Sequence, residues 1–152
     1  MATRSGSVDP GLLLELMREG YNAEAMADML QKESGLKGLS GLSGDMREIR
    51  TAAAKGHNGA IRALEVFRHR LIQMLGAMAA SLRGVDVLAL TGGIGEHDQQ
   101  LQVELKQATS WWGEVDMNVI PADEEGMIAR LCRRQSTPDP TSDCSAGSAA
   151  IR

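Results

Sequence analysis

A stripe of apolar residues between positions 58 and 83 is the feature that most constrains how this chain can fold. Its members recur at spacings of three and four residues: Ile61, Leu64, Phe67, Leu71, Leu75, Met78 and Leu82. That spacing predicts a half-buried helix over residues 58–83, which Gly84 ends and whose apolar face must pack on other elements. Gly76, inside this helix, indicates close packing against a neighbouring element.

The segments after this helix alternate between strand and helix patterns. Residues 85–90 are almost continuously apolar and predict a short buried strand, and residues 116–120 predict a second strand. Helices are expected over 98–108, between the strands, and over 124–134. This alternation predicts an α/β protein in which the two strands pair in parallel.

The first 57 residues are expected to be mainly helical. Asp9 followed by Pro10 is typical of a helix start, and this helix should stop at Gly20. Asn22 can cap a second helix, which Gly35 should end. Residues 35–44 carry glycine at every third position and predict a structured loop, after which Asp45 can open a short helix.

Composition excludes several classes of protein. Of 152 residues, 43% are hydrophobic and 24% charged, the net charge is −4, and two residues are cysteine. No apolar run is long enough for a membrane helix, and no basic stripe offers a nucleic-acid surface. We therefore expect a globular protein of the reducing cytoplasm, with neither a membrane nor a nucleic acid as partner. Residues 135–152 are polar and proline-spotted and predict a disordered tail.

The glycine-rich turn at residues 91–96, between the first strand and the next helix, is the strongest local sign of a binding site. Glycine lets backbone N–H groups approach an anion, and the carboxyl ends of parallel strands are where open α/β sheets bind ligands. A tight turn whose glycines only satisfy dihedral angles is an equally good interpretation. The turn matches neither the Rossmann fingerprint nor a Walker A loop.

Other candidate residues have plain structural alternatives when each is taken alone. Arg4 could clamp a carboxylate or phosphoryl group, or could be a solvated terminal arginine. Asp45 and Arg47 could simply cap a helix and form a surface ion pair. Glu124 follows the second strand and could bind magnesium, or could be an acidic residue that suits a helix N-terminus.

Four motifs in order resemble the C-terminal part of the acetate, propionate and butyrate kinase family. They are residues 3–10 (TRSGSVDP), 34–47 (SGLKGLSGLSGDMR), 91–96 (TGGIGE) and 120–125 (IPADEE). The resemblance implies a partial RNase-H-like C-terminal domain of the actin-like ATPase superfamily, over residues 1–134, helix-rich with a small remnant of a parallel sheet. It also implies the reaction ATP + acetate ⇌ ADP + acetyl phosphate, with Mg²⁺ as cofactor.

The same resemblance implies roles for individual residues. Arg4 matches the family's active-site arginine, and Glu124 matches the glutamate linked to magnesium. The remaining matches are expected to bind the nucleotide: Asp45, Met46, Arg47, Gly93, Ile94, Gly95, Glu96 and His97. Phosphoryl transfer suits such residues, since it depends mainly on positioning and on neutralising charge.

Departures from the family pattern limit what this chain is expected to do alone. Family members are more than twice as long, and the N-terminal domain and the opening strands of the C-terminal domain have no counterpart here. His97 replaces the usual asparagine, and Gln102 stands where an arginine is common. We expect an acetate kinase fragment that is inactive alone, or a half-enzyme completed by an N-terminal half or a homodimer partner. The alternatives are a propionate or butyrate kinase fragment and a non-catalytic nucleotide-binding or interaction module.

Overall fold

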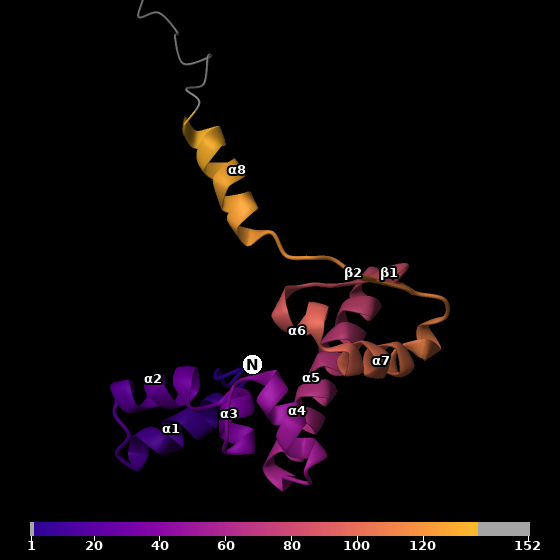
Figure 1. Cartoon of the computed structure of the whole chain (residues 1–152). Coiled ribbons are helices and arrows are strands. Elements are labelled where there is room, and N and C mark those ends of the chain that lie inside the picture. The colour runs from indigo at the N-terminus through magenta and orange to yellow at the C-terminus, as the bar shows by residue number, and fades with distance from the viewer. Residues whose placement is uncertain (1, 137–152) are drawn as a thin grey trace, which may run out of the picture.

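The computed structural model describes residues 2–136, and the chain is helix-rich with one small sheet (Figure 1). In chain order the elements are α1 (Pro10–Arg18), α2 (Ala23–Lys32), α3 (Gly35–Ser40), α4 (Met46–Ala54), α5 (Asn58–Leu82), β1 (Val87–Leu90), α6 (Gly92–His97), α7 (Gln99–Ala108), η1 (Ser110–Trp112), β2 (Asp116–Val119) and α8 (Glu124–Ser136). The predicted tail lies outside the described residues, except for residues 135 and 136, which continue α8.

Helices α1 and α2 begin where the capping residues predict. The Asp9 carboxylate accepts a hydrogen bond from the backbone N–H of Gly11 at 2.6 Å, and the Asn22 side chain accepts one from Ala25 at 2.9 Å. Each bond satisfies one of the N–H groups that the first helical turn leaves without an intrahelical partner. Local sequence therefore sets the start of both helices.

The glycine-rich segment corrects one expectation, because residues 35–40 form helix α3 instead of a loop. Glycine is a poor helix former, but α3 packs along α5, and tertiary burial outweighs propensity. Leu36 is fully buried there. A Cβ at position 38 would meet the Glu33 carbonyl oxygen at 2.5 Å, so glycine is required where α3 approaches the end of α2. Gly41 ends the helix in the left-handed region, with φ +69°.

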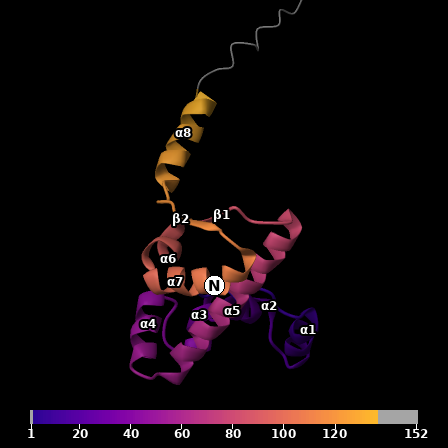
Figure 2. The ribbon, with the colours of Figure 1, turned by 90° about the vertical axis from the view of Figure 1, so that its right-hand side faces the viewer.

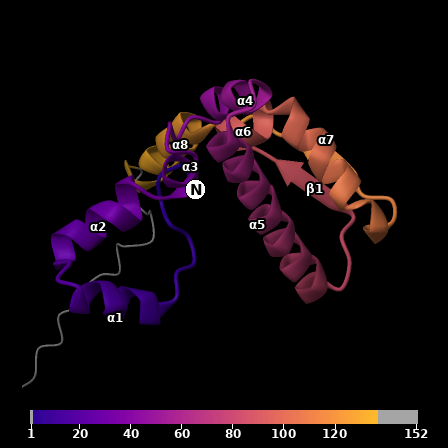
Figure 3. The ribbon, with the colours of Figure 1, turned by 90° about the horizontal axis from the view of Figure 1, so that it is seen from below.

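Helix α5 forms where the apolar stripe predicts a helix. It runs through the middle of the molecule (Figure 3). Its first two turns pack on α3 and α4 and form a small apolar core. The buried members of this core are Leu36, Met46, Ile49, Ala60 and Ala63. The expectation for Gly76 is wrong, because a Cβ there would meet no atom of residues 2–136 within 4 Å. Close packing occurs instead at Gly59, where a Cβ would lie against the Ser40 carbonyl oxygen.

Strands β1 and β2 pair in parallel, as expected, with Val87 opposite Asp116 and Leu90 opposite Val119. The chain between them forms α6, α7 and η1, and the sheet lies beside these helices (Figure 2). Residues 91–96 were expected as a turn, but residues 92–97 form the short helix α6, which begins two residues after the end of β1. Gly92, at φ +73°, provides the change of direction between strand and helix.

Large apolar side chains remain exposed on the second half of α5 and on α8. The side chains of Met74, Met78 and Leu82, in the second half of α5, are 67%, 59% and 72% exposed. Helix α8 stands off from the other elements (Figure 1), and its Met127 and Ile128 are also exposed. Such surfaces are typical of contacts with further protein. None of the helices in residues 2–136 is long and apolar enough to cross a membrane.

Candidate functional site

A cleft of about 680 Å³ lies between the start of α4 and the α6–α7 segment. Its lining residues are Ala2, Gly44, Asp45, Met46, Arg47, Arg50, Gly93, Ile94, His97, Asp98, Gln99 and Gln100. The fold thus brings residues 45–47 and three residues of the segment 93–97 (Gly93, Ile94 and His97) to one cavity, although more than forty positions separate them in the sequence. A groove of this size accommodates a small organic ligand.

Apolar residues shared with the protein core line part of the cleft. Met46 is only 6% exposed and belongs to the buried core, and Ile94 packs against the same core from α6. Because both residues also line the cleft, its apolar surface is continuous with the core. Such a surface suits a flat, uncharged group such as a nucleobase.

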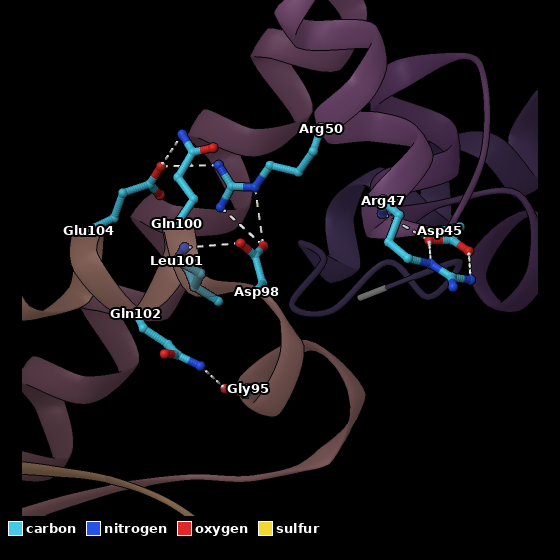
Figure 4. Close-up of polar contacts among 9 residues, drawn as sticks. All are labelled: Asp45, Arg47, Arg50, Gly95, Asp98, Gln100, Leu101, Gln102 and Glu104. Carbon is cyan, nitrogen blue, oxygen red and sulfur yellow. Dashed lines mark hydrogen bonds and ion pairs between the residues drawn. The ribbon is translucent and has the colours of Figure 1, made fainter.

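Asp45 performs two structural tasks at the mouth of the cleft (Figure 4). Its Oδ1 caps α4 by accepting a hydrogen bond from the backbone N–H of Arg47 at 2.8 Å. The Arg47 guanidinium folds back on the same carboxylate, with Nη2 2.6 Å from Oδ2 and Nε 3.1 Å from Oδ1. These side-chain hydrogen bonds, and then the backbone bond, lower the pKa of Asp45 to about 2. The same carboxylate raises the pKa of Arg47.

The charges that line the cleft compensate one another. Asp45 pairs with Arg47, and Asp98 pairs with Arg50, whose Nη2 lies 3.1 Å from the Asp98 carboxylate. A cleft with internally paired charges favours a neutral ligand group over a multiply charged one. The arrangement therefore fits a nucleoside better than a triphosphate.

Gly95 and Glu96 lie outside the cleft lining, although both belong to the predicted nucleotide loop. The Gln102 side-chain amide donates hydrogen bonds to the carbonyl oxygens of Gly95, at 2.9 Å, and Glu96, at 3.3 Å. The Glu96 carboxylate accepts a hydrogen bond from the backbone N–H of Ala122 at 3.0 Å. These bonds fix the end of α6 and tie it to the segment that precedes Glu124.

Arg4 is exposed and is absent from the cleft lining, although its near neighbour Ala2 is part of that lining. The surrounding segment is held by backbone hydrogen bonds: Ser34 donates to the Thr3 carbonyl oxygen, and Ser5 donates to that of Leu30, both at 2.9 Å. These bonds hold the backbone on either side of Arg4, and its side chain lies in solvent.

Glu124, the predicted magnesium residue, is exposed at the first position of α8. It is also absent from the cleft lining. Over residues 2–136, no three His, Cys, Asp or Glu side chains gather as a metal site would require. Magnesium commonly takes only one or two protein carboxylates and completes its coordination with water and substrate phosphates. The exposed carboxylate of Glu124 is chemically compatible with that mode of binding.

Sequence reasoning missed a group of half-buried polar residues beside the cleft. Arg50 on α4 bonds to Asp98 and Glu104, which lie 48 and 54 positions away in the sequence (Figure 4). Asp98 was predictable only as a helix cap, and its carboxylate does accept a bond from the Leu101 backbone N–H at 3.0 Å. Nothing local in the sequence indicates that an arginine on one helix reaches these acids.

Comparison with known proteins places these motifs in one family. Residues 1–130 match the model of the Acetokinase family. The acetate kinase of Acaryochloris marina is 51% identical over 113 residues, which are 74% of this chain and 28% of that protein. The acetate kinase of Microcystis aeruginosa is 50% identical over 119 residues, 77% of this chain and 30% of that protein.

Solved structures agree with the sequence matches. The Porphyromonas gingivalis acetate kinase superposes with a TM-score of 0.82 at 35% identity, over 88% of this chain and 40% of that chain. A propionate kinase from Francisella tularensis superposes with a TM-score of 0.80 at 31% identity, over 86% of this chain and 39% of that one. The predicted helix-rich α/β fold with a small parallel sheet is confirmed. The chain spans about a third of the length of the relatives it matches.

Proposed function

The chain belongs to the Acetokinase family, and on this premise we propose that it forms the nucleotide side of an acetate kinase active site. The reaction is the transfer of a phosphoryl group between ATP and acetate. The rest of the site comes from sequence outside these 152 residues, in a longer polypeptide or a separate subunit. Alone, the 152 residues bind nucleotide weakly and do not turn over substrate.

One observation carries this proposal: residues 45–47 meet Gly93, Ile94 and His97 in a single cleft with an apolar surface. An adenosine group fits such a cleft, because its base is flat and its ribose is uncharged. The phosphates would extend beyond the cleft, since the charged groups lining it are already paired. We assign Asp45, Met46, Arg47, Gly93, Ile94 and His97 to adenosine binding. Gly95 and Glu96 support the loop through their bonds to other segments.

Arg4 and Glu124 are proposed to act at the phosphoryl end of the nucleotide. A guanidinium can hold a carboxylate and a transferring phosphoryl group with two parallel hydrogen bonds. Magnesium, when bound, neutralises charge on the phosphoryl oxygens. Both side chains are exposed, as expected for groups that meet a ligand between two parts of a protein. The cytoplasmic location remains a prediction.

Titration calorimetry of the full chain with adenosine, ADP and Mg-ADP tests the binding proposal. A leucine at Gly93 should abolish binding without unfolding the chain, because a Cβ there meets no described atom within 4 Å and the position lines the cleft. Gly76→Leu is the matched control, since that glycine also faces open space but lies on α5. Absence of heat with millimolar ligand, or equal binding by both variants, would remove the proposal.

A chimera separates a kinase from a non-catalytic nucleotide-binding module. Residues 1–130 would replace the matching segment of the P. gingivalis acetate kinase, and acetyl phosphate formation would be measured. We expect activity in the chimera and none in the 152-residue chain. Arg4→Ala in the chimera should abolish turnover while ADP still binds. An inactive but folded chimera that binds ADP would favour the non-catalytic module.

A propionate kinase is the second candidate, supported by the fold match to the F. tularensis enzyme. The choice of acyl group depends on parts of the site beyond this chain. Reading the coding DNA upstream of Met1 would reveal whether the rest of an acyl-kinase site is encoded there.

A further inference from the structure

The side chain of Arg50 connects the two walls of the cleft (Figure 4). Its Nε and Nη2 each lie 3.1 Å from Oδ2 of Asp98, and its Nη1 donates to Oε1 of Glu104 at 3.0 Å. Gln100 donates to the same Glu104 oxygen at 3.0 Å and so helps to orient that carboxylate. We call Arg50, Asp98 and Glu104 the Arg50 clamp.

The Arg50 clamp is shielded from water, unlike most ion pairs described in this chain. The side chains of Arg50, Asp98 and Glu104 are 17%, 9% and 19% exposed, whereas those of the Arg18–Glu15 pair are 76% and 58% exposed. Low exposure reduces screening by solvent and salt, so hydrogen bonds between charged groups are stronger here than on the surface. The hydrogen bonds of the clamp therefore favour one relative position of the Arg50, Asp98 and Glu104 side chains.

The clamp joins α4, which carries one half of the candidate site, to Asp98 and α7, which directly follow α6, the helix that carries the other half. Asp45 caps helix α4, and Arg50 lies just over one turn beyond the first helical residue, Met46. Asp98 follows α6 directly and caps α7 through the Leu101 backbone N–H. Helices α4 and α7 both contact α5, Ile94 of α6 packs on the core that includes Met46 of α4, and the clamp adds a polar bridge between the walls.

We propose that Arg50 is a positioning residue that sets the separation of the two cleft walls and thereby the affinity for nucleotide. It is not a ligand group, because its Nε, Nη1 and Nη2 are all bonded to the two carboxylates. This inference rests on the proposed function, because it takes a nucleotide to be the ligand of the cleft. The spacing of the walls itself can be measured without any ligand.

The test pairs a distance measurement with a binding measurement on the full chain. Double electron–electron resonance measures the separation of the walls between two spin labels. The labels are attached to Ala54→Cys on α4 and Gln107→Cys on α7, two exposed positions. The background carries serine at Cys132 and Cys144, the two native cysteines. Wild type, Arg50→Gln and Arg50→Lys are compared, with Arg18→Gln as the control that removes one arginine from an exposed pair.

We expect a single narrow distance in wild type and in the Arg18 control, and a broader one in Arg50→Gln. The Kd for ADP should rise about tenfold or more in Arg50→Gln, the loss expected when hydrogen bonds between charged groups are removed. The Kd of Arg50→Lys for ADP should lie between those of the wild type and Arg50→Gln. A lysine keeps the positive charge but lacks the forked guanidinium that bonds both carboxylates. Circular dichroism checks that each variant is folded, and if Arg50→Gln is not, Arg50→Lys and Glu104→Gln decide.

Each other outcome overturns a defined part of the reasoning. An unchanged distance with weaker ADP binding would mean that Arg50 contacts the nucleotide directly. A broader distance with unchanged affinity would mean that the clamp does not serve the cleft. If wild type binds no ADP, the proposed function fails, while the distance data still decide whether Arg50 holds the walls together.

Discussion

The same substitution at two glycines of α5 should change stability in opposite directions. Gly59 lies in the first turn of the helix, where a Cβ would be placed against the Ser40 carbonyl oxygen and 3.2 Å from the Ser40 carbonyl carbon. These are backbone atoms of α3, which cannot move away without disturbing the packing of α3 on α5. At Gly76 a Cβ would meet no atom of the described chain within 4 Å.

The expected magnitudes follow from these surroundings. Replacing glycine by alanine inside a helix stabilises the fold by about 1 kcal/mol, which is the full expected effect of Gly76→Ala. At Gly59 the stabilisation from the higher helix propensity of alanine is smaller, because the position lies near the helix start. Overpacking against Ser40 costs about 1–3 kcal/mol, so Gly59→Ala should lower the free energy of unfolding by about 1–2 kcal/mol. With a urea m-value of about 2 kcal/mol per M, the midpoints should shift by about 0.5 M or more in opposite directions.

Urea unfolding followed by circular dichroism at 222 nm measures both shifts in one series. A double variant should show nearly additive effects, because the two positions lie more than four helical turns apart. If both alanines stabilise the chain, the close approach of α3 to α5 at Gly59 is wrong. If both destabilise it, the second half of α5 is more tightly packed than described.

Three further outcomes are expected. Because the pKa of Asp45 is lowered from 3.8 to about 2, its contribution to stability is complete above pH 4 and is lost as the pH falls toward 2. Asp45→Asn, which keeps a cap acceptor but weakens the pair with Arg47, should flatten acid unfolding in that range, and an unchanged acid profile would contradict the assignment. In Glu96→Ala the Ala122 N–H loses its acceptor, and Ala122 precedes Glu124, the proposed magnesium residue. This variant should therefore gain less ADP affinity from magnesium than the wild type, while its affinity for adenosine stays unchanged. Glu96→Gln keeps an acceptor oxygen, so calorimetry in which both variants lose the magnesium effect would refute this. The exposed apolar side chains of α5 and α8 predict self-association, and light scattering that finds only monomer at high concentration would disprove it.

Local chemistry in the sequence determined where four of the eight α-helices in residues 2–136 begin. Asp9, Asn22, Asp45 and Asp98 each accept a hydrogen bond from a backbone N–H of the following helix. Such caps act over two or three residues, so their pattern can be read without knowing the fold. The long helix α5 was equally predictable, because its apolar period, from Ile61 to Leu82, extends over about six turns.

Tertiary structure alone decided the conformation of the glycine-rich segments. Residues 35–40 and 92–97 have few side chains to signal a period. The first segment is helical where it packs along α5, and the second where Gly95 lies close to Leu90 of β1. The predicted importance of Gly76, and the missed importance of Gly59, have the same cause. Whether a glycine is needed depends on the neighbouring backbone, which may come from any part of the chain.

The candidate site divides in the same way. Its nucleotide residues were predicted by resemblance to a family, and the fold then placed residues 45–47 on one cleft with Gly93, Ile94 and His97. The Arg50 clamp was not predictable, since Arg50 meets acids 48 and 54 residues away. Caps and periodic stripes depend on bonds between near neighbours in the chain. Clefts and shielded ion pairs depend on which distant segments the hydrophobic core brings together.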